Sequence, residues 1–186
     1  MDSARIAPGL LLAMPQLDDP NFQRAVVLMV QHTEQGSFGL VLNRPSETPV
    51  IDVTAPMGMR WRGDPSAVIW VGGPVSPESG WLLHEPTDTV AAGEGTLEVT
   101  HEISLSTSPQ HFRALVEHPP RRVRLFAGYA GWGAHQLESE LAQGAWLTAG
   151  LTPALVFDTP AERMWDEALH SLGIEPASLV PGAGVH

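Results

Sequence analysis

The residues best suited to chemistry in this chain fall into two segments, each beside an expected strand end. The first is Asn43-Arg44-Pro45. Its proline fixes the backbone next to an arginine whose planar guanidinium can grip a carboxylate through two parallel hydrogen bonds. Two kinds of partner suit Arg44: an internal carboxylate, Glu138 or Glu140, or an acidic or phosphorylated group of another molecule. The sequence leaves both interpretations open.

The second segment runs from Gly128 to Glu140 and combines glycines, aromatic rings and carboxylates. Three glycines within six residues predict a shaped loop between a strand and a helix, because glycine accepts positive φ and close backbone approach. We predict that Asn43-Arg44-Pro45 lies beside the first turn after Gly133, so that the two segments form one binding surface. The predicted binding residues are Asn43, Arg44, Gly128, Tyr129, Gly131, Trp132, Gly133, Gln136 and Glu138.

The known catalytic and phosphate-binding motifs do not fit. The three glycines are spaced G-x-x-G-x-G, whereas dinucleotide folds use G-x-G-x-x-G and P-loops need a lysine, which this chain lacks. There is no G-x-S-x-G nucleophile elbow, and His84-Glu85 and His101-Glu102 lack the second histidine of a zinc helix. Asp18 and Asp19 precede Pro20, where a turn cap is expected. We therefore expect no catalytic residue, metal or cofactor, and a binding domain more than an enzyme.

Composition predicts one folded domain over residues 1–186, and the prolines and glycines near its end predict a flexible tail at 177–186. The hydrophobic fraction of 43% is typical of globular chains. The net charge of -11 repels phosphate backbones, and the arginines at 121, 122 and 124 form only a small basic cluster, so direct nucleic-acid binding is disfavoured. No apolar run approaches the ~20 residues of a membrane span, and no signal peptide is evident, so we expect a cytoplasmic protein.

Local patterns predict an α+β fold with a mixed, mostly antiparallel sheet, because short strands and hairpin signals outnumber the helices. A hairpin is expected at 25–42, an irregular arm with one helical turn around 51–55 at 46–65, and a helix at 159–172 with a capping box at Thr159-Pro160-Ala161-Glu162. Ser108-Pro109 predicts the start of another helix. The expected strands are 8–14, 25–32, 38–42, 68–71, 80–84, 97–99, 103–105, 123–127, 146–147 and 155–157, and the expected helices are 108–117, 137–144 and 159–172.

Together with Met14-Pro15, Asp19-Pro20 and Gly72-Gly73-Pro74-Val75, the two segments make the chain resemble the AlgH/YqgE family of small bacterial proteins. The family tends to have a small residue before the glutamine, so His135 departs from its pattern. The resemblance runs over residues 6–174, which it implies are the core of the domain. It also implies a bifurcated, mixed sheet folded as a pseudo-barrel with helices packed outside.

The resemblance also implies regulation, since one family member is described as a transcriptional regulator. We expect a regulatory or binding domain that acts through an unknown protein or small-molecule partner. The alternatives are a small-molecule sensor or enzyme with a pocket at the glycine-rich segment, and a direct transcriptional regulator, which the acidic charge disfavours.

Overall fold

The computed structural model describes residues 6–17, 19–90 and 93–179. By their internal contacts these residues form two compact units, which are described separately here. The first unit contains the described residues up to Arg44, then Gly72–Val75 and the residues from Tyr129 onward. The second contains Pro45–Val71 and the described residues of Ser76–Gly128.

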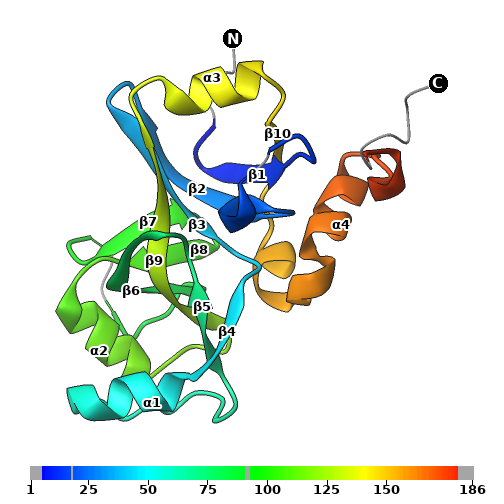
Figure 1. Cartoon of the computed structure of the whole chain (residues 1–186). Helices are drawn as coiled ribbons and strands as arrows, with labels where there is room; N and C mark the ends of the chain where they lie inside the picture. The colour runs from blue at the N-terminus through cyan, green and yellow to red at the C-terminus, as the bar shows by residue number, and fades with distance from the viewer. Residues whose placement is uncertain (1–5, 18, 91–92, 180–186) are drawn as a thin grey trace. The chain divides into compact units, whose positions relative to one another are not determined.

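The first unit is built on an antiparallel sheet (Figure 1). Neighbouring strands follow the order β10, β1, β2, β3 and β9, and the predicted hairpin of β2 with β3 is confirmed. A β-bulge between Met29 and Gln31 shifts the register of that hairpin. The strands are β1 (Gly9–Ala13), β2 (Val26–Thr33), β3 (Gly36–Val41), the last part of β9 (Val123–Gly133) and β10 (Trp146–Ala149).

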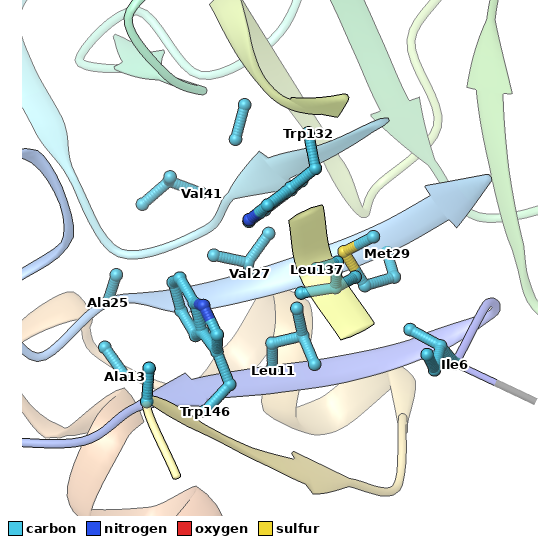
Figure 2. Close-up of a cluster of buried hydrophobic side chains, with 12 residues drawn as sticks. Ile6, Leu11, Ala13, Ala25, Val27, Met29, Val41, Trp132, Leu137 and Trp146 are labelled. Carbon is cyan, nitrogen blue, oxygen red and sulfur yellow. The ribbon is translucent and has the colours of Figure 1, made fainter. Parts of the chain in front are cut away.

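The strand β1 and the first half of β2, Val26–Met29, are buried on both faces, which explains their continuous apolar sequences. One face packs Leu11 and Val27 against Trp132, Trp146 and Leu137, the last from α3 (Gln136–Ala142), as Figure 2 shows. The helix α4 (Ala161–Ser171) packs on β1 and β10 and buries its apolar stripe. Burying each large aliphatic side chain contributes about 1.5–3 kcal/mol. The shorter helices of this unit are η2 (Pro20–Phe22), η4 (Ala154–Asp158) and η5 (Pro176–Leu179).

The second unit holds a branched, mixed sheet and two short helices (Figure 1). The strand β5 pairs antiparallel with β4 and parallel with β9, while β8 pairs antiparallel with both β6 and β7. The two helices lie side by side, and Arg113 of α2 donates to the carbonyl oxygen of Gly58 after η3. The elements are β4 (Pro45–Pro49), α1 (Val50–Thr54), η3 (Ala55–Met57), β5 (Val68–Val71), β6 (Val75–His84), β7 (Thr96–Thr100), β8 (Ile103–Ser106), α2 (Pro109–Glu117) and the first part of β9.

The predicted α+β class with a mostly antiparallel, branched sheet is confirmed, but the glycine-rich segment is a strand and not a loop. The strand β9 continues through the glycines to Gly133, and its residues 130–133 pair with Gly36–Gly39 of β3. Glycine is a poor strand former, so the segment is typical of a loop when it is considered alone. Its partner strand, also rich in glycine, makes the close pairing possible.

Gly73 lies against β9 at a point where the fold requires glycine. Its φ is +154°, and a Cβ atom there would lie 2.2 Å from the backbone carbon of Tyr129. Since the clash is with backbone, a side chain cannot move aside, and glycine is needed for β9 to pass so close.

Other predictions have mixed outcomes. The helix at 108–117 is confirmed, and Ser108 Oγ accepts from the backbone nitrogen of His111. The arm at 46–65 contains most of β4, because β5 supplies its hydrogen-bonding partner, and its predicted helical turn is confirmed as α1. Residues 155–157 form η4 in place of a strand. The helix at 159–172 forms without its capping box: Pro160 is the N-cap, and Thr159 Oγ1 donates to the carbonyl oxygen of Ala154.

The two remaining predictions concern the turn at Asp18 and Asp19 and the C-terminal tail. Asp19 Oδ1 accepts from the backbone nitrogen of Asn21, as a turn cap should, while Asp18 lies outside the described residues. The start of the predicted flexible tail belongs to the short helix η5, and residues 180–186 lie outside the described residues.

Candidate functional site

The predicted single surface is wrong in its geometry, because its two halves lie at opposite ends of β3. Gly133 pairs with Gly36 at the first residue of that strand, whereas Asn43 lies two residues beyond its last residue, Val41. Seven residues of extended chain separate the two points, which corresponds to about 20 Å or more. The binding roles of the individual residues stay predictions, and each half is described on its own.

Asn43 and Arg44 hold the backbone at the start of β2. Asn43 Oδ1 accepts from the backbone nitrogen of Val26 at 3.0 Å, and its Nδ2 donates to the carbonyl oxygen of Arg24 at 2.9 Å. The guanidinium of Arg44 donates to the carbonyl oxygen of Gln23. Burial lowers the pKa of Arg44 from its usual value. The expected ion pair of Arg44 with Glu138 or Glu140 is therefore wrong: its internal partner is a backbone carbonyl.

Arg24 lies in the segment that Asn43 and Arg44 hold, and its backbone conformation is unusual. Its φ of +54° is left-handed, which costs a non-glycine residue about 1–3 kcal/mol and persists only where the surroundings enforce it. The guanidinium carbon of Arg24 lies 5.1 Å from the centre of the Trp165 ring, within range of a cation–π contact. Trp165 is itself fixed, because its Nε1 donates to the carbonyl oxygen of Ala13 at 2.9 Å.

Arg24 and Trp165 line a cavity of about 310 Å³ in the first unit. Its polar groups come from Asp19, Gln23 and Arg24, and its apolar walls from Met14, Pro15, Leu17, Pro20, Trp165 and Leu179. A volume of this size, with apolar walls and a few convergent polar groups, is typical of a small-molecule site. The cavity includes Met14-Pro15 and Asp19-Pro20, two of the segments that carried the family resemblance.

The other half of the predicted surface is organised by Glu140 of α3. Its Oε1 accepts from Trp132 Nε1 at 3.0 Å and from Trp146 Nε1 at 2.8 Å, and its Oε2 accepts from Gln136 Nε2 at 3.0 Å. The Oε1 atom of Gln136 accepts in turn from the backbone nitrogen of Gly133. The rings of Trp132 and Trp146 meet edge to face at 5.9 Å. Trp132, Gly133 and Gln136 thus belong to one internal network.

Glu138 takes part in a second chain of polar groups. Its Oε2 lies 3.4 Å from His32 Nε2, and His32 Nδ1 lies 2.5 Å from Ser37 Oγ. A hydroxyl, an imidazole and a carboxylate in line are the components of a nucleophile with a general base. The ring nitrogens are exchanged relative to a Ser-His-Asp triad, in which the serine contacts Nε2.

The last three predicted residues follow one another along β9. Gly128 has a φ of +75°, which requires glycine, and lies in the second unit. In the first unit, the Tyr129 ring meets Phe38 edge to face at 5.5 Å, and Gly131 lies exposed beside the Tyr129 ring. The Tyr129 ring thus lies half-exposed on the surface of the strand.

Within the described ranges, no three histidine or carboxylate side chains converge as cation ligands, so no residue is assigned to a metal. No helix in the same ranges has both the length and the apolarity to cross a bilayer.

No sequence motif marks Arg24 or Trp165, the residues at the centre of the cavity. A left-handed arginine has no local signature, and Trp165 is 152 residues from its hydrogen-bond partner Ala13. The signal that the sequence does give for this region is the pair of segments Met14-Pro15 and Asp19-Pro20, which carry part of the family resemblance.

The comparisons with known proteins agree with the fold and with these segments. The AlgH-like family model (DUF179) matches residues 10–177, so the chain belongs to the AlgH-like family. A UPF0301 protein of Myxococcus xanthus is 40% identical over 182 residues, which are 97% of this chain and 98% of that protein. A UPF0301 protein of Vibrio parahaemolyticus is 35% identical, covering 94% and 95% of the two chains.

Two solved structures are similar to the chain. The solution structure of the AlgH protein from Pseudomonas aeruginosa has a TM-score of 0.75 and 36% identity, covering 97% of this chain and 95% of that one. A crystal structure of a Corynebacterium diphtheriae protein has a TM-score of 0.69 and 26% identity, covering 88% and 86%. The resemblance to the AlgH/YqgE family is confirmed.

Proposed function

We propose that this protein is a regulatory binding domain that responds to a small zwitterionic metabolite, such as a free amino acid, held in the cavity of Arg24 and Trp165. The supporting observation is the strained arginine placed on an indole at the wall of that cavity. In this proposal the domain performs no chemistry on its ligand, and its output goes to a partner protein.

The charges of the cavity support a zwitterion. The guanidinium of Arg24 offers a planar pair of donors that fits a carboxylate, in a chain whose net charge of -11 otherwise repels anions. The carboxylate of Asp19 lines the same cavity and suits an ammonium group. The apolar walls then accept the remainder of a small ligand.

Asn43 and Arg44 act as positioning residues in this proposal. Their side chains hold the carbonyl oxygens of Gln23 and Arg24 and the nitrogen of Val26, which keeps the left-handed residue in place. Preorganised donors cost no further ordering when the ligand arrives, so affinity depends on this clamp as well as on Arg24. The predicted residues Asn43 and Arg44 thus serve binding from behind the cavity wall.

The test is a titration of the ¹⁵N-labelled protein with a panel of free amino acids, followed at the indole Nε1–H signals. We expect the Trp165 signal, assigned from Trp165→Phe, to move with at least one amino acid. The Arg24→Gln variant should lose the response. Arg163→Gln is the matched control, because Arg163 is an exposed arginine of the same unit that faces Glu167 and lies outside the cavity.

Two results would contradict the proposal: an unmoved Trp165 signal across the whole panel, or an equal response in Arg24→Gln and the parent protein. Asn43→Asp refines the test. An ionised carboxylate can still accept from Val26 but cannot donate to Arg24, so affinity should fall while the fold, monitored by circular dichroism, is retained.

An enzyme is the second candidate, favoured by the line of Ser37, His32 and Glu138. None of these three residues lines the cavity of Arg24. A fluorophosphonate probe labels serines that a histidine activates, so it separates the candidates. Labelling that disappears in Ser37→Ala would support the enzyme, whereas an unlabelled protein would support the binding domain.

A further inference from the structure

The second unit contains a larger cavity, of about 590 Å³, which the proposed function does not use. It lies between residues 61–70 and residues 119–125, so it combines the loop before β5 with the connection from α2 to β9. Three of the ten arginines of this acidic chain line it: Arg62, Arg121 and Arg124. Two indoles, of Trp61 and Trp70, complete its distinctive lining.

The three arginines of the cavity differ in their surroundings. The guanidinium carbon of Arg124 lies 4.1 Å from the centre of the Trp70 ring, so this arginine and indole form one stacked wall. Arg62 and Arg121 are exposed, and no ion pair or side-chain hydrogen bond to either is found within the described part of the chain. Two guanidinium forks in one cavity suit a phosphate group, which they can bind through paired charge-assisted hydrogen bonds.

The walls of the cavity are held in place by their own contacts. Trp61 Nε1 donates to the carbonyl oxygen of Asp64 at 2.8 Å, and the backbone nitrogen of Arg62 donates to the carbonyl oxygen of Val116 at the end of α2. Asp64 Oδ1 accepts from the backbone nitrogen and the hydroxyl of Ser66, and these bonds lower the pKa of Asp64. The carboxylate is therefore anionic at neutral pH, and it suits a ligand hydroxyl more than a second phosphate.

We propose that this cavity binds a mononucleotide. Arg62 and Arg121 bind its phosphate, the indole of Trp61 receives the planar base, and Asp64 accepts from a ribose hydroxyl. The volume decides against inorganic phosphate as the full ligand, because a cavity of this size accommodates a ligand of nucleotide size. The chain lacks a P-loop and a dinucleotide motif, so recognition here depends on arginine and indole side chains.

The experiment is isothermal titration of the whole chain with ATP, AMP, adenosine and inorganic phosphate at low salt. We expect ATP and AMP to bind, and adenosine and phosphate each to bind at least about tenfold more weakly, since each lacks one part of the ligand. Arg62→Ala and Arg121→Ala should each weaken ATP binding about tenfold or more. Trp61→Phe, which retains an aromatic face, should bind more tightly than Trp61→Ala.

Arg113→Ala is the matched control, because it removes one positive charge from an arginine of the same unit that lies outside the cavity. Its affinity for ATP should equal that of the parent protein. Equal losses in Arg113→Ala and Arg121→Ala would overturn the site, since they would show a general charge effect. Absence of ATP binding up to millimolar concentration would overturn it as well.

A further arm uses a ten-nucleotide single-stranded RNA. Tighter binding of the RNA than of ATP, lost in Arg121→Ala, would overturn the mononucleotide assignment in favour of a nucleic-acid strand. Weaker binding of the RNA supports it, because the net charge of -11 opposes a long polyanion while a single nucleotide experiences mainly the local arginines.

Discussion

At the scale of single residues, Glu140 shows how one half-buried acceptor can organise a whole region. It accepts from two indole nitrogens of the first-unit core and from Gln136, whose own oxygen holds Gly133. Trp132 and Trp146 are nearly buried, with 6% and 2% of their surfaces exposed, so water cannot easily replace the carboxylate. The end of β9 is thus fixed to α3 through the side chains of Glu140 and Gln136.

We therefore expect Glu140→Ala to lower the free energy of unfolding by about 2–4 kcal/mol, because two buried donors lose their acceptor. Glu140→Gln should cost less, since the amide oxygen can still accept. Glu138→Ala is the control, as Glu138 is exposed and its carboxylate faces His32. Urea denaturation of the three variants makes the measurement, and equal stability of Glu140→Ala and Glu138→Ala would contradict the interpretation.

His84, at the end of β6, gives the protein a pH-dependent stability. Its Nδ1 donates to the carbonyl oxygen of Glu85 at 2.7 Å, and its Nε2 is buried with no hydrogen-bond partner among the described residues. Burial lowers the pKa of His84, although the bond to Glu85 partly opposes this effect. The folded protein therefore favours the neutral ring.

Because the unfolded state binds this proton more tightly, stability should be greatest above pH 6.5 and fall as the pH drops from 6.5 toward the lower pKa of the folded state. The slope from one proton is at most about 1.4 kcal/mol per pH unit. Between pH 7 and pH 5.5, the free energy of unfolding of His84→Gln should decrease less than that of the parent protein. His101→Gln, at a fully exposed position beside Glu98, should show the parental decrease.

At the scale of elements, helix ends show which local signals are realised in the fold. Both α2 and α4 have a hydroxyl and a proline at their expected starts. Ser108 caps α2, whereas Thr159 donates to the preceding helix η4 and leaves α4 without a side-chain cap. The difference arises because η4 places the carbonyl oxygen of Ala154 within reach of Thr159.

This difference predicts unequal costs for two similar substitutions. Ser108→Ala should destabilise the protein by about 1 kcal/mol, the usual value of an N-cap. Thr159→Ala should cost less, because it removes one exposed hydrogen bond and no cap. Thermal unfolding of both variants gives the comparison, and a larger loss for Thr159→Ala would show that the η4 contact is more important than the cap.

At the scale of the whole molecule, the distribution of charge favours the two proposed small-ligand sites over direct DNA binding. The net charge of -11 disfavours a polyanion, whereas Arg24 in one unit and Arg62 with Arg121 in the other create local cationic sites. Small anionic groups can use such sites without contact along a charged backbone.

We expect no binding of duplex DNA, measured by fluorescence anisotropy at about 50 mM salt, where electrostatic association is strong. A mixed-sequence duplex tests the electrostatic contribution, because non-specific binding depends on phosphate contacts. Tight association that weakens steeply with added salt would contradict this expectation and would favour a direct regulator.

The sequence by itself determined the features that short stretches of chain encode. The two apolar runs and the glycine-containing connection at residues 25–42 specified a hairpin, Ser108-Pro109 specified a helix start, and the short motifs together specified the family. Each of these signals depends on residues within a few positions of one another, where backbone preference and hydrophobic period act directly.

Tertiary structure alone decided the rest, because the deciding contacts join distant parts of the chain. A glycine-rich segment became a strand when β3 offered its hydrogen bonds, and Arg44 found a backbone carbonyl in place of a carboxylate. The cavity beside Trp165 exists because that indole reaches Ala13 across 152 residues. No local propensity contains such contacts, since their free energy appears only when the packed chain brings the partners together.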